Sequence, residues 1–259
     1  TRLALVDSIT SPTGLVLPIK DIIDGLKAKG VETLVDGAHA LGMVPLDLDA
    51  LGAAYFTSNA HKWLCTPKGS AVLHVRRDLQ DHVKPLNLSH GVGWQGPQYD
   101  TPFRMAFDWT GTDDPTPFLC IPEAIRFLSS LDEGGLEGLM NRNRALALQA
   151  RDLLCATLDI PAPAPDSMIA SLAAIPLPTM EWTPESPEDI CALQKRLYDD
   201  HLIQVPIFPF PSPSKPVLRC RQGNFGIGRG LRGGSNVPGS WPWPWLWRTA
   251  LRYLKRLFP

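Results

Sequence analysis

The sequence predicts an α/β fold, with a mostly parallel sheet in a large first domain and a small α+β domain after it. Three observations support this prediction. Strand-like and helix-like patterns alternate as far as residue 75, helical patterns dominate residues 115–158, and the proline-rich segment 161–165 has the composition of a linker. Strands that alternate with helices are typical of a parallel sheet, because every parallel crossover needs a connecting element.

The elements of the first part follow from the spacing of apolar residues. A strand shows a short apolar run, whereas an amphipathic helix repeats its apolar positions every three or four residues. The expected elements are a strand at 2–7, a helix at 19–29, a strand ending at Asp36, a short helix at 46–52, and strands at 53–58 and 70–75.

The rest of the chain is mostly helical before it returns to strands. The expected elements are helical structure at 115–131, a long amphipathic helix at 136–158, a strand at 170–177, a helix at 188–201 and a strand at 203–208. We therefore expect three parts. They are residues 1–158 in the large domain, residues 159–221 in the small domain, and residues 222–259 as a divergent basic tail rich in glycine and tryptophan.

The composition predicts a soluble enzyme. The chain has 259 residues, 44% of them hydrophobic, and a formal net charge of −1, which permits a sizeable core. No apolar run is long enough for a transmembrane helix, and the start lacks a signal-peptide pattern. The five cysteines lack metal-ligand spacing, so we expect free thiols, no metal, and a cytoplasmic location.

Asp36 and Lys62 stand out because each follows a predicted strand. Asp36 closes the run Thr33–Asp36, and Lys62 lies in Thr57–Trp63, just after the next strand. Taken alone, Asp36 would be an ordinary loop carboxylate and Lys62 an ordinary surface lysine. As a pair at the carboxyl ends of neighbouring strands they predict a pyridoxal phosphate (PLP) site, because open α/β sheets bind ligands there. A carboxylate can keep a pyridine nitrogen protonated, and a lysine can hold an aldehyde as a Schiff base.

These residues, together with the segment Asp7–Ile19, resemble the class V aminotransferase family of fold-type I PLP-dependent enzymes. Within it the segment is similar to the isopenicillin N epimerase-like subgroup. The resemblance runs from about Arg2 to Leu131 and continues more weakly to about Arg219. It implies the PLP-dependent transferase fold of type I, with PLP as the cofactor.

The resemblance also implies roles for individual residues around the cofactor. Lys62 matches the Schiff-base lysine, and Asp36 matches the carboxylate that pairs with the pyridinium nitrogen. His39 stands where the family places a side chain near the phenolic oxygen. Ser58 and His61 stand where side chains bind the phosphate, as hydroxyl and imidazole donors can. Each of the last three could instead have a structural role.

Three further positions are implied at the edges of this site. Ser11, in the segment before the cofactor strand, is expected to contact the cofactor. Thr112 resembles the threonine that reaches the phosphate of the neighbouring subunit's cofactor, which implies a homodimer. Arg219 matches the arginine that clamps the substrate α-carboxylate, a task that suits a planar guanidinium, and Arg221 is its rival.

The implied reaction begins with removal of the α-proton of an amino-acid substrate by Lys62. Reprotonation on the opposite face would make the enzyme an epimerase, expulsion of a β-sulfur group would make it a C–S lyase, and transamination is a third outcome. A cysteine desulfurase is less expected, because it needs a nucleophilic cysteine on a mobile loop. Cys191 lies in a helical pattern, Cys65 is expected to point into the strand turn, and Cys220 follows the substrate arginine.

Two departures from the family lead to an alternative. From the resemblance we expect the chain to begin inside the large domain, without the family's phosphate loop and the residue that stacks on the cofactor ring. The alternative is a truncated, non-catalytic paralogue or a fragment that retains part of the PLP pocket. The second departure is the tail after Arg221, whose glycines, tryptophans and basic charge could suggest RNA binding. We expect instead a C-terminus unrelated to the family, with no nucleic-acid or membrane partner.

Overall fold

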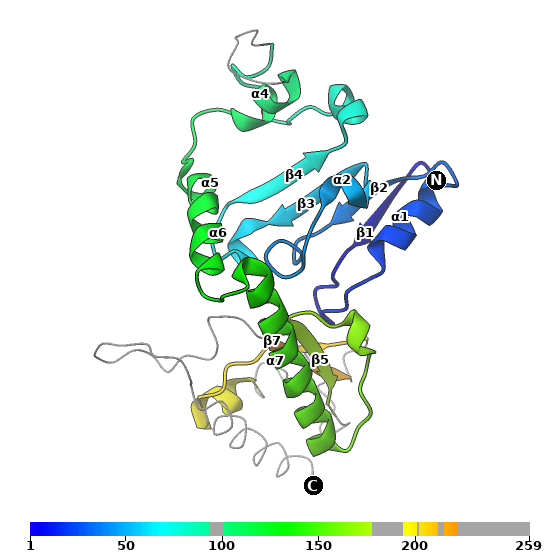
Figure 1. Cartoon of the computed structure of the whole chain (residues 1–259), viewed down its shortest axis with the longest axis vertical. Helices are drawn as coiled ribbons and strands as arrows, with labels where there is room; N and C mark the ends of the chain where they lie inside the picture. The colour runs from blue at the N-terminus through cyan, green and yellow to red at the C-terminus, as the bar shows by residue number, and fades with distance from the viewer. Residues whose placement is uncertain (94–100, 178–193, 201, 212–214, 222–259) are drawn as a thin grey trace, which may run out of the picture. The chain divides into compact units, whose positions relative to one another are not determined.

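A computed structural model describes residues 1–93, 101–177, 194–200, 202–211 and 215–221 (Figure 1). The predicted tail lies outside these residues. The chain divides into two compact units, which we describe separately. The first contains Thr1–Ile9 and Leu17–Glu137, and the second contains Thr10–Val16 and the chain from Gly138 onward.

The first unit is built on a sheet of four strands in the order β1-β2-β3-β4 (Figure 1). The strands are β1 (Leu3–Asp7), β2 (Glu32–Asp36), β3 (Tyr55–Asn59) and β4 (Ala71–Val75). β1 pairs with β2 and β2 with β3 in parallel, whereas β3 and β4 are antiparallel. The prediction of an α/β fold with a mostly parallel sheet is therefore confirmed.

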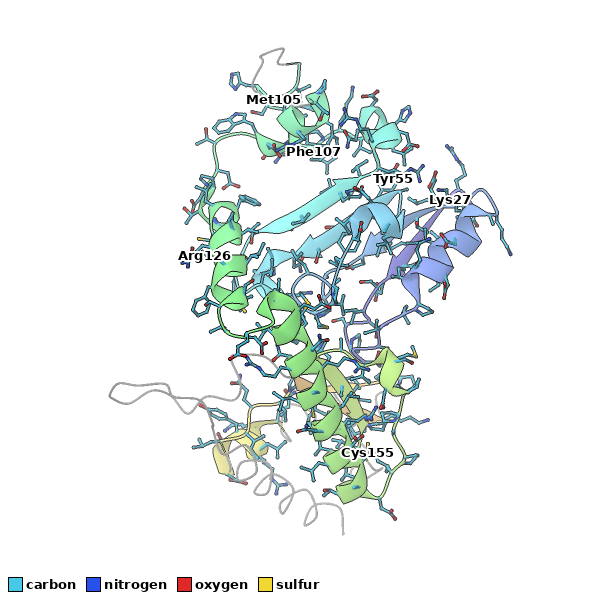
Figure 2. All side chains as sticks on the ribbon, viewed as in Figure 1. Lys27, Tyr55, Met105, Phe107, Arg126 and Cys155 are labelled. Atoms are coloured by element: carbon cyan, nitrogen blue, oxygen red, sulfur yellow. The ribbon has the colours of Figure 1, made fainter. Side chains whose placement is uncertain are left out.

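The helices α1 (Ile19–Lys27) and α2 (Leu48–Leu51) connect the three parallel strands. One face of the sheet is buried, because Thr33, Val35, Phe56 and Ser58 alternate with less buried neighbours along β2 and β3. Tyr55, labelled in Figure 2, belongs to the other, less buried set. This period of two is what a sheet with one covered face requires.

Further short helices follow the sheet. They are α3 (Ala60–Trp63), the 3-10 helix η1 (Arg77–His82), α4 (Pro102–Asp108), α5 (Thr116–Leu119) and α6 (Ile121–Ser129). Met105 and Phe107 of α4 are labelled in Figure 2. The helical structure predicted at 115–131 is present as two helices. Pro122 explains the interruption, since it lacks the N–H of a continuous helix and is tolerated in a first turn.

The second unit contains the long helix α7 (Gly135–Leu158), the 3-10 helix η2 (Asp166–Met168) and an antiparallel sheet in the order β5-β7-β6. Its strands are β5 (Leu172–Pro176), β6 (Ile207–Pro209) and β7 (Pro216–Arg221). Its core contains Leu154, Cys155, Ile175, Leu197, Ile207, Leu218 and Cys220.

Some predicted boundaries differ in the structure. The strand expected at 203–208 is present only as β6, and prolines at 206 and 209 explain why pairing is short, since proline donates no ladder hydrogen bond. Of the helix expected at 188–201, residues 194–200 are described and helical.

The boundary between the two units lies in the first turn of α7, between Glu137 and Gly138, and not after the helix. The proline-rich segment 161–165 lies within the second unit, where Arg151 donates to the Ala164 carbonyl at 3.4 Å. The domain boundaries of the complete protein stay a prediction. Across the described residues, no helix is both long and apolar enough to cross a membrane.

Candidate active site

Asp36 lies at the carboxyl end of β2, where its backbone and side chain are both anchored. The Asp36 carbonyl accepts a hydrogen bond from Ser8 N at 2.8 Å, and its Oδ1 accepts one from Ala38 N at 2.8 Å. Oδ2 makes no hydrogen bond to any residue that the structure describes, and the side chain is half-buried. The carboxylate is thus held by one oxygen, and the other can accept a donor from a ligand.

The loop that follows β2 lies directly against β3 and α3. Gly37 N donates to Thr57 O at 2.7 Å, and a Cβ at Gly37 would lie 2.2 Å from Cζ of Phe56. Gly42 has φ +81°, and a Cβ there would lie 2.9 Å from the carbonyl carbon of Trp63. Glycine is therefore required at both positions, because a side chain at Gly37 would collide with β3 and one at Gly42 would collide with α3.

Ser58 connects the same two segments through its hydroxyl group. The side chain is fully buried, its Oγ donates to Gly37 O at 2.6 Å, and it accepts from Leu41 N at 3.2 Å. A serine hydroxyl has one hydrogen, and here that hydrogen bonds to a backbone carbonyl. Phosphate binding by Ser58 stays a prediction, and it would require this hydrogen bond to be exchanged.

The histidines and Lys62 complete this edge of the sheet. Trp63 Nε1 donates to Nδ1 of His39 at 3.3 Å, which joins the loop after β2 to α3. Nδ1 of His61 lies 3.2 Å from Ser70 O, and this contact orients the imidazole. Lys62, the next residue of α3, is half-buried. The structure therefore places five predicted residues, Asp36, His39, Ser58, His61 and Lys62, in two adjoining segments at the carboxyl ends of β2 and β3.

The other predicted residues do not belong to these two segments. Thr112 is exposed between α4 and α5 in the first unit. Ser11 and Arg219 both belong to the second unit, where the Arg219 guanidinium donates to Ser11 O and lies 4.8 Å from the centroid of the Phe208 ring. The structure thus brings Ser11 and Arg219 together, whereas the side chain of Arg221 lies outside the described part of the chain.

A charged cluster braces the opposite edge of the first sheet. Arg76, just after β4, donates to Glu32 at 2.8 and 3.0 Å and to Asp78 at 2.7 and 2.9 Å. The hydrogen bond from Arg76 lowers the pKa of the Glu32 carboxyl. Since Glu32 begins β2 and Asp36 ends it, this cluster holds the sheet together without taking part in the site.

Two of the four described cysteines, Cys155 and Cys220, are buried thiols. Burial raises the pKa of the Cys155 thiol and raises the pKa of Cys220 to about 12. Both are core residues. Cys65 is exposed with φ 59°, and its Sγ donates to the carbonyl oxygens of Lys62 and Trp63 at 3.7 and 3.6 Å, so the thiol points into the turn after β3 as predicted. No group of described residues could hold a metal ion, and Cys191 lies outside them.

Sequence reasoning missed two structural features of the site. It did not assign Trp63 as the partner of His39, and it did not foresee that the Ser58 hydroxyl is used to hold a loop. The two glycines at 37 and 42 were the available signal, because glycines that flank a candidate functional loop often mark close backbone contact. No local pattern identifies which side chain then fills the space.

Comparisons with known proteins identify the family of the chain. The profile of the family described as aminotransferase class-V matches residues 1–186. The chain is 31% identical over 228 residues to L-cysteine desulfhydrase from Arabidopsis thaliana, covering 87% of this chain and 46% of that protein. It is 33% identical over 230 residues to isopenicillin N epimerase from Amycolatopsis lactamdurans, covering 85% and 54%. The chain thus spans about half the length of these curated relatives.

Two solved structures of the cystine C–S lyase C-DES share the fold. One, a complex with the reaction product cysteine persulfide, gives a TM-score of 0.70 at 19% identity and covers 100% of this chain and 62% of that one. The other, with glycine covalently linked to the PLP cofactor, gives a TM-score of 0.68 at 19% identity and covers 99% and 60%. This likeness confirms the predicted fold of type I.

Proposed function

The chain belongs to the class V aminotransferase family of PLP-dependent enzymes, and we propose that the protein containing it uses PLP to act on an amino acid. The observation that carries the proposal is the pairing of Asp36 and Lys62 at the carboxyl ends of adjacent parallel strands. These residues fit the cofactor. Asp36 Oδ2 can accept a ring N–H, and Lys62 carries the amine that a cofactor aldehyde requires.

Each residue of this pair has a distinct role in the proposal. When bound, PLP supplies a conjugated ring that takes up electrons from the substrate α-carbon. Asp36 holds a proton on the ring nitrogen through a charge-assisted hydrogen bond, which is stronger than a neutral one. Lys62 would hold the cofactor covalently, and its amine, when free, would accept the substrate α-proton at Nζ.

The neighbouring side chains are assigned to the polar groups of the cofactor. His39, on the same loop as Asp36, is proposed to contact the phenolic oxygen, and His61 is proposed to contact the phosphate. Ser58 supports His39 by fixing the loop after β2, and phosphate contact by its hydroxyl is proposed only with the exchange described above. Thr112 is proposed to reach the phosphate in a second subunit, which makes the enzyme a homodimer.

The second unit supplies the proposed substrate contact. Arg219 presents a planar guanidinium that stacks on Phe208 and donates to the Ser11 carbonyl, so its plane is held from two sides. A fork of this kind recognises a carboxylate through two parallel hydrogen bonds. We therefore assign Arg219 to the α-carboxylate of the substrate, with Ser11 as the residue that orients it. Ser11 is also proposed to contact the cofactor.

Three reactions are compatible with these residues, and one of them is transamination. Return of the proton from the opposite face would epimerise the α-carbon, and loss of a β-sulfur substituent would cleave a C–S bond. A desulfhydrase and an epimerase each share about a third of their aligned residues with this chain, so sequence identity alone does not decide between C–S cleavage and epimerisation. The predicted reducing compartment leads us to propose a cytoplasmic enzyme.

Hydrogen–deuterium exchange at the substrate α-carbon tests the shared step. The complete protein is incubated with PLP and an amino acid in D2O, and the α-proton signal is followed by NMR, with sulfide release from L-cysteine measured in parallel. Lys62→Ala should slow exchange by at least about a hundredfold, the scale of a lost general base. Lys68→Ala, at an exposed lysine in the same connection, is the matched control and should exchange normally.

The outcomes separate the alternatives. Exchange with sulfide release identifies a C–S lyase, and exchange with inversion alone identifies an epimerase. Normal exchange in the Lys62→Ala variant would refute the role of Lys62. PLP binding without exchange for any amino acid tried would favour the non-catalytic alternative.

A further inference from the structure

The hydrogen bond between Trp63 and His39 determines where His39 carries its proton. The Trp63 indole N–H can only donate, and it lies 3.3 Å from Nδ1 of His39. Nδ1 must therefore be the acceptor, which means that it carries no proton. A neutral imidazole has one N–H, so the proton of His39 is on Nε2.

The surrounding backbone holds the two rings at this distance. Trp63 is 7% exposed, and its backbone lies against Gly42, where a Cβ would approach within 2.9 Å. The loop that carries His39 is fixed on both sides of it, because Ser58 Oγ donates to Gly37 O and accepts from Leu41 N. Protonation of His39 would place two N–H groups against each other, because both Nδ1 and the indole would then be donors. The same geometry therefore disfavours the imidazolium.

We propose that Trp63 is a positioning residue, which holds His39 in the neutral form with its proton on Nε2 and so makes Nε2 a hydrogen-bond donor to the phenolic oxygen of PLP. The identity of the acceptor rests on the proposed function, whereas the position of the proton does not. With the opposite tautomer, Nε2 would present a lone pair to an anionic oxygen. Trp63 directly follows Lys62 in the sequence. Its hydrogen bond to His39 therefore joins the segment of Lys62 to the loop that follows Asp36.

The position of the proton can be measured without cofactor. The full chain is labelled with 15N histidine, and ring correlations show which nitrogen of each of the six histidines is protonated. His39→Gln assigns the His39 signals, and the other five histidines are the internal reference. In the unsubstituted chain we expect His39 with an unprotonated Nδ1 and a proton on Nε2. A proton on Nδ1 would overturn the proposal, and this readout comes from the unsubstituted chain.

Trp63→Phe tests whether the indole is the cause, because it keeps a large aromatic side chain and removes the donor. The ratio of the Nε2-H to the Nδ1-H form of His39 should fall about fivefold, the scale of one net hydrogen bond. An unchanged ratio in a folded Trp63→Phe chain would show that Trp63 only fills space, and would overturn its positioning role.

Adding PLP to the labelled chain separates this inference from the proposed function. The Nε2 proton signal of His39 should move on binding, and it should move less in Trp63→Phe. If PLP binds and the signal does not move, His39 is not the donor to the phenolic oxygen. If PLP does not bind to the complete protein while Nε2 carries the proton, the proposed function fails and the tautomer assignment stands.

Discussion

Replacing Ser58 with alanine separates a loop-holding role from a phosphate-binding role. The fully buried hydroxyl donates to Gly37 O at 2.6 Å and accepts from Leu41 N at 3.2 Å. Gly37 O keeps a second donor, Ala40 N at 2.7 Å, so only the Leu41 N–H loses its acceptor. A buried donor left without a partner costs about 1–3 kcal/mol, and we expect Ser58→Ala to lower the free energy of unfolding by about 2 kcal/mol.

Thermal unfolding in the absence of PLP measures this loss. For a chain of this size about 2 kcal/mol corresponds to a fall in Tm of about 4–8 °C. Ser130→Ala is the matched control, since its exposed hydroxyl bonds only to the Phe127 carbonyl, and it should stay within about 0.5 kcal/mol. Unchanged stability of Ser58→Ala without PLP, combined with lost PLP affinity, would refute the loop-holding role and assign the hydroxyl to the phosphate.

Three further outcomes follow from the same structure. Gly42→Ala should destabilise the chain by about 1–3 kcal/mol in urea unfolding, because φ is +81° and the new Cβ would lie 2.9 Å from the α3 backbone; a neutral effect would contradict the contact. Arg76 holds the pKa of Glu32 below its ordinary value of 4.5. The free energy of unfolding lost in Arg76→Gln should therefore be largest above pH 4.5 and shrink as the pH falls through the lowered pKa. A loss of unfolding free energy that grows on acidification would contradict the lowered pKa. A thiol reagent at neutral pH should label exposed Cys65 and not Cys220, whose pKa burial raises to about 12, and labelling of Cys220 in the native chain, read by mass spectrometry, would contradict its burial.

The strands and the site of the first unit could be predicted because the sequence carries local signals for them. The alternation of buried positions in β2 and β3 produces the apolar pattern that predicted both strands, and Asp36 follows directly from where β2 ends. The antiparallel β4 was expected as a strand, but its direction depends on the turn before it and on pairing with β3. Strand direction is a property of the assembled sheet.

The parts that could not be predicted depend on contacts between distant residues. Nothing near Ser58 in the sequence indicates that Leu41 and Gly37 use its hydroxyl, and nothing near Trp63 indicates that its indole meets His39. The strand β6 is short because prolines interrupt it, although the apolar run before them favours a longer strand. Patterns of spacing report burial, whereas hydrogen-bond partners are set by the fold.

Borohydride reduction of the PLP-loaded complete protein, followed by peptide mapping, tests the central claim most directly. Our account predicts a reduction-stable link between the cofactor and Lys62, present in the unsubstituted protein and in Lys68→Ala and lost in Lys62→Ala. A link at another lysine, or the same absorbance and labelling after Lys62 is replaced, would contradict the assignment of this edge of the sheet as the cofactor site.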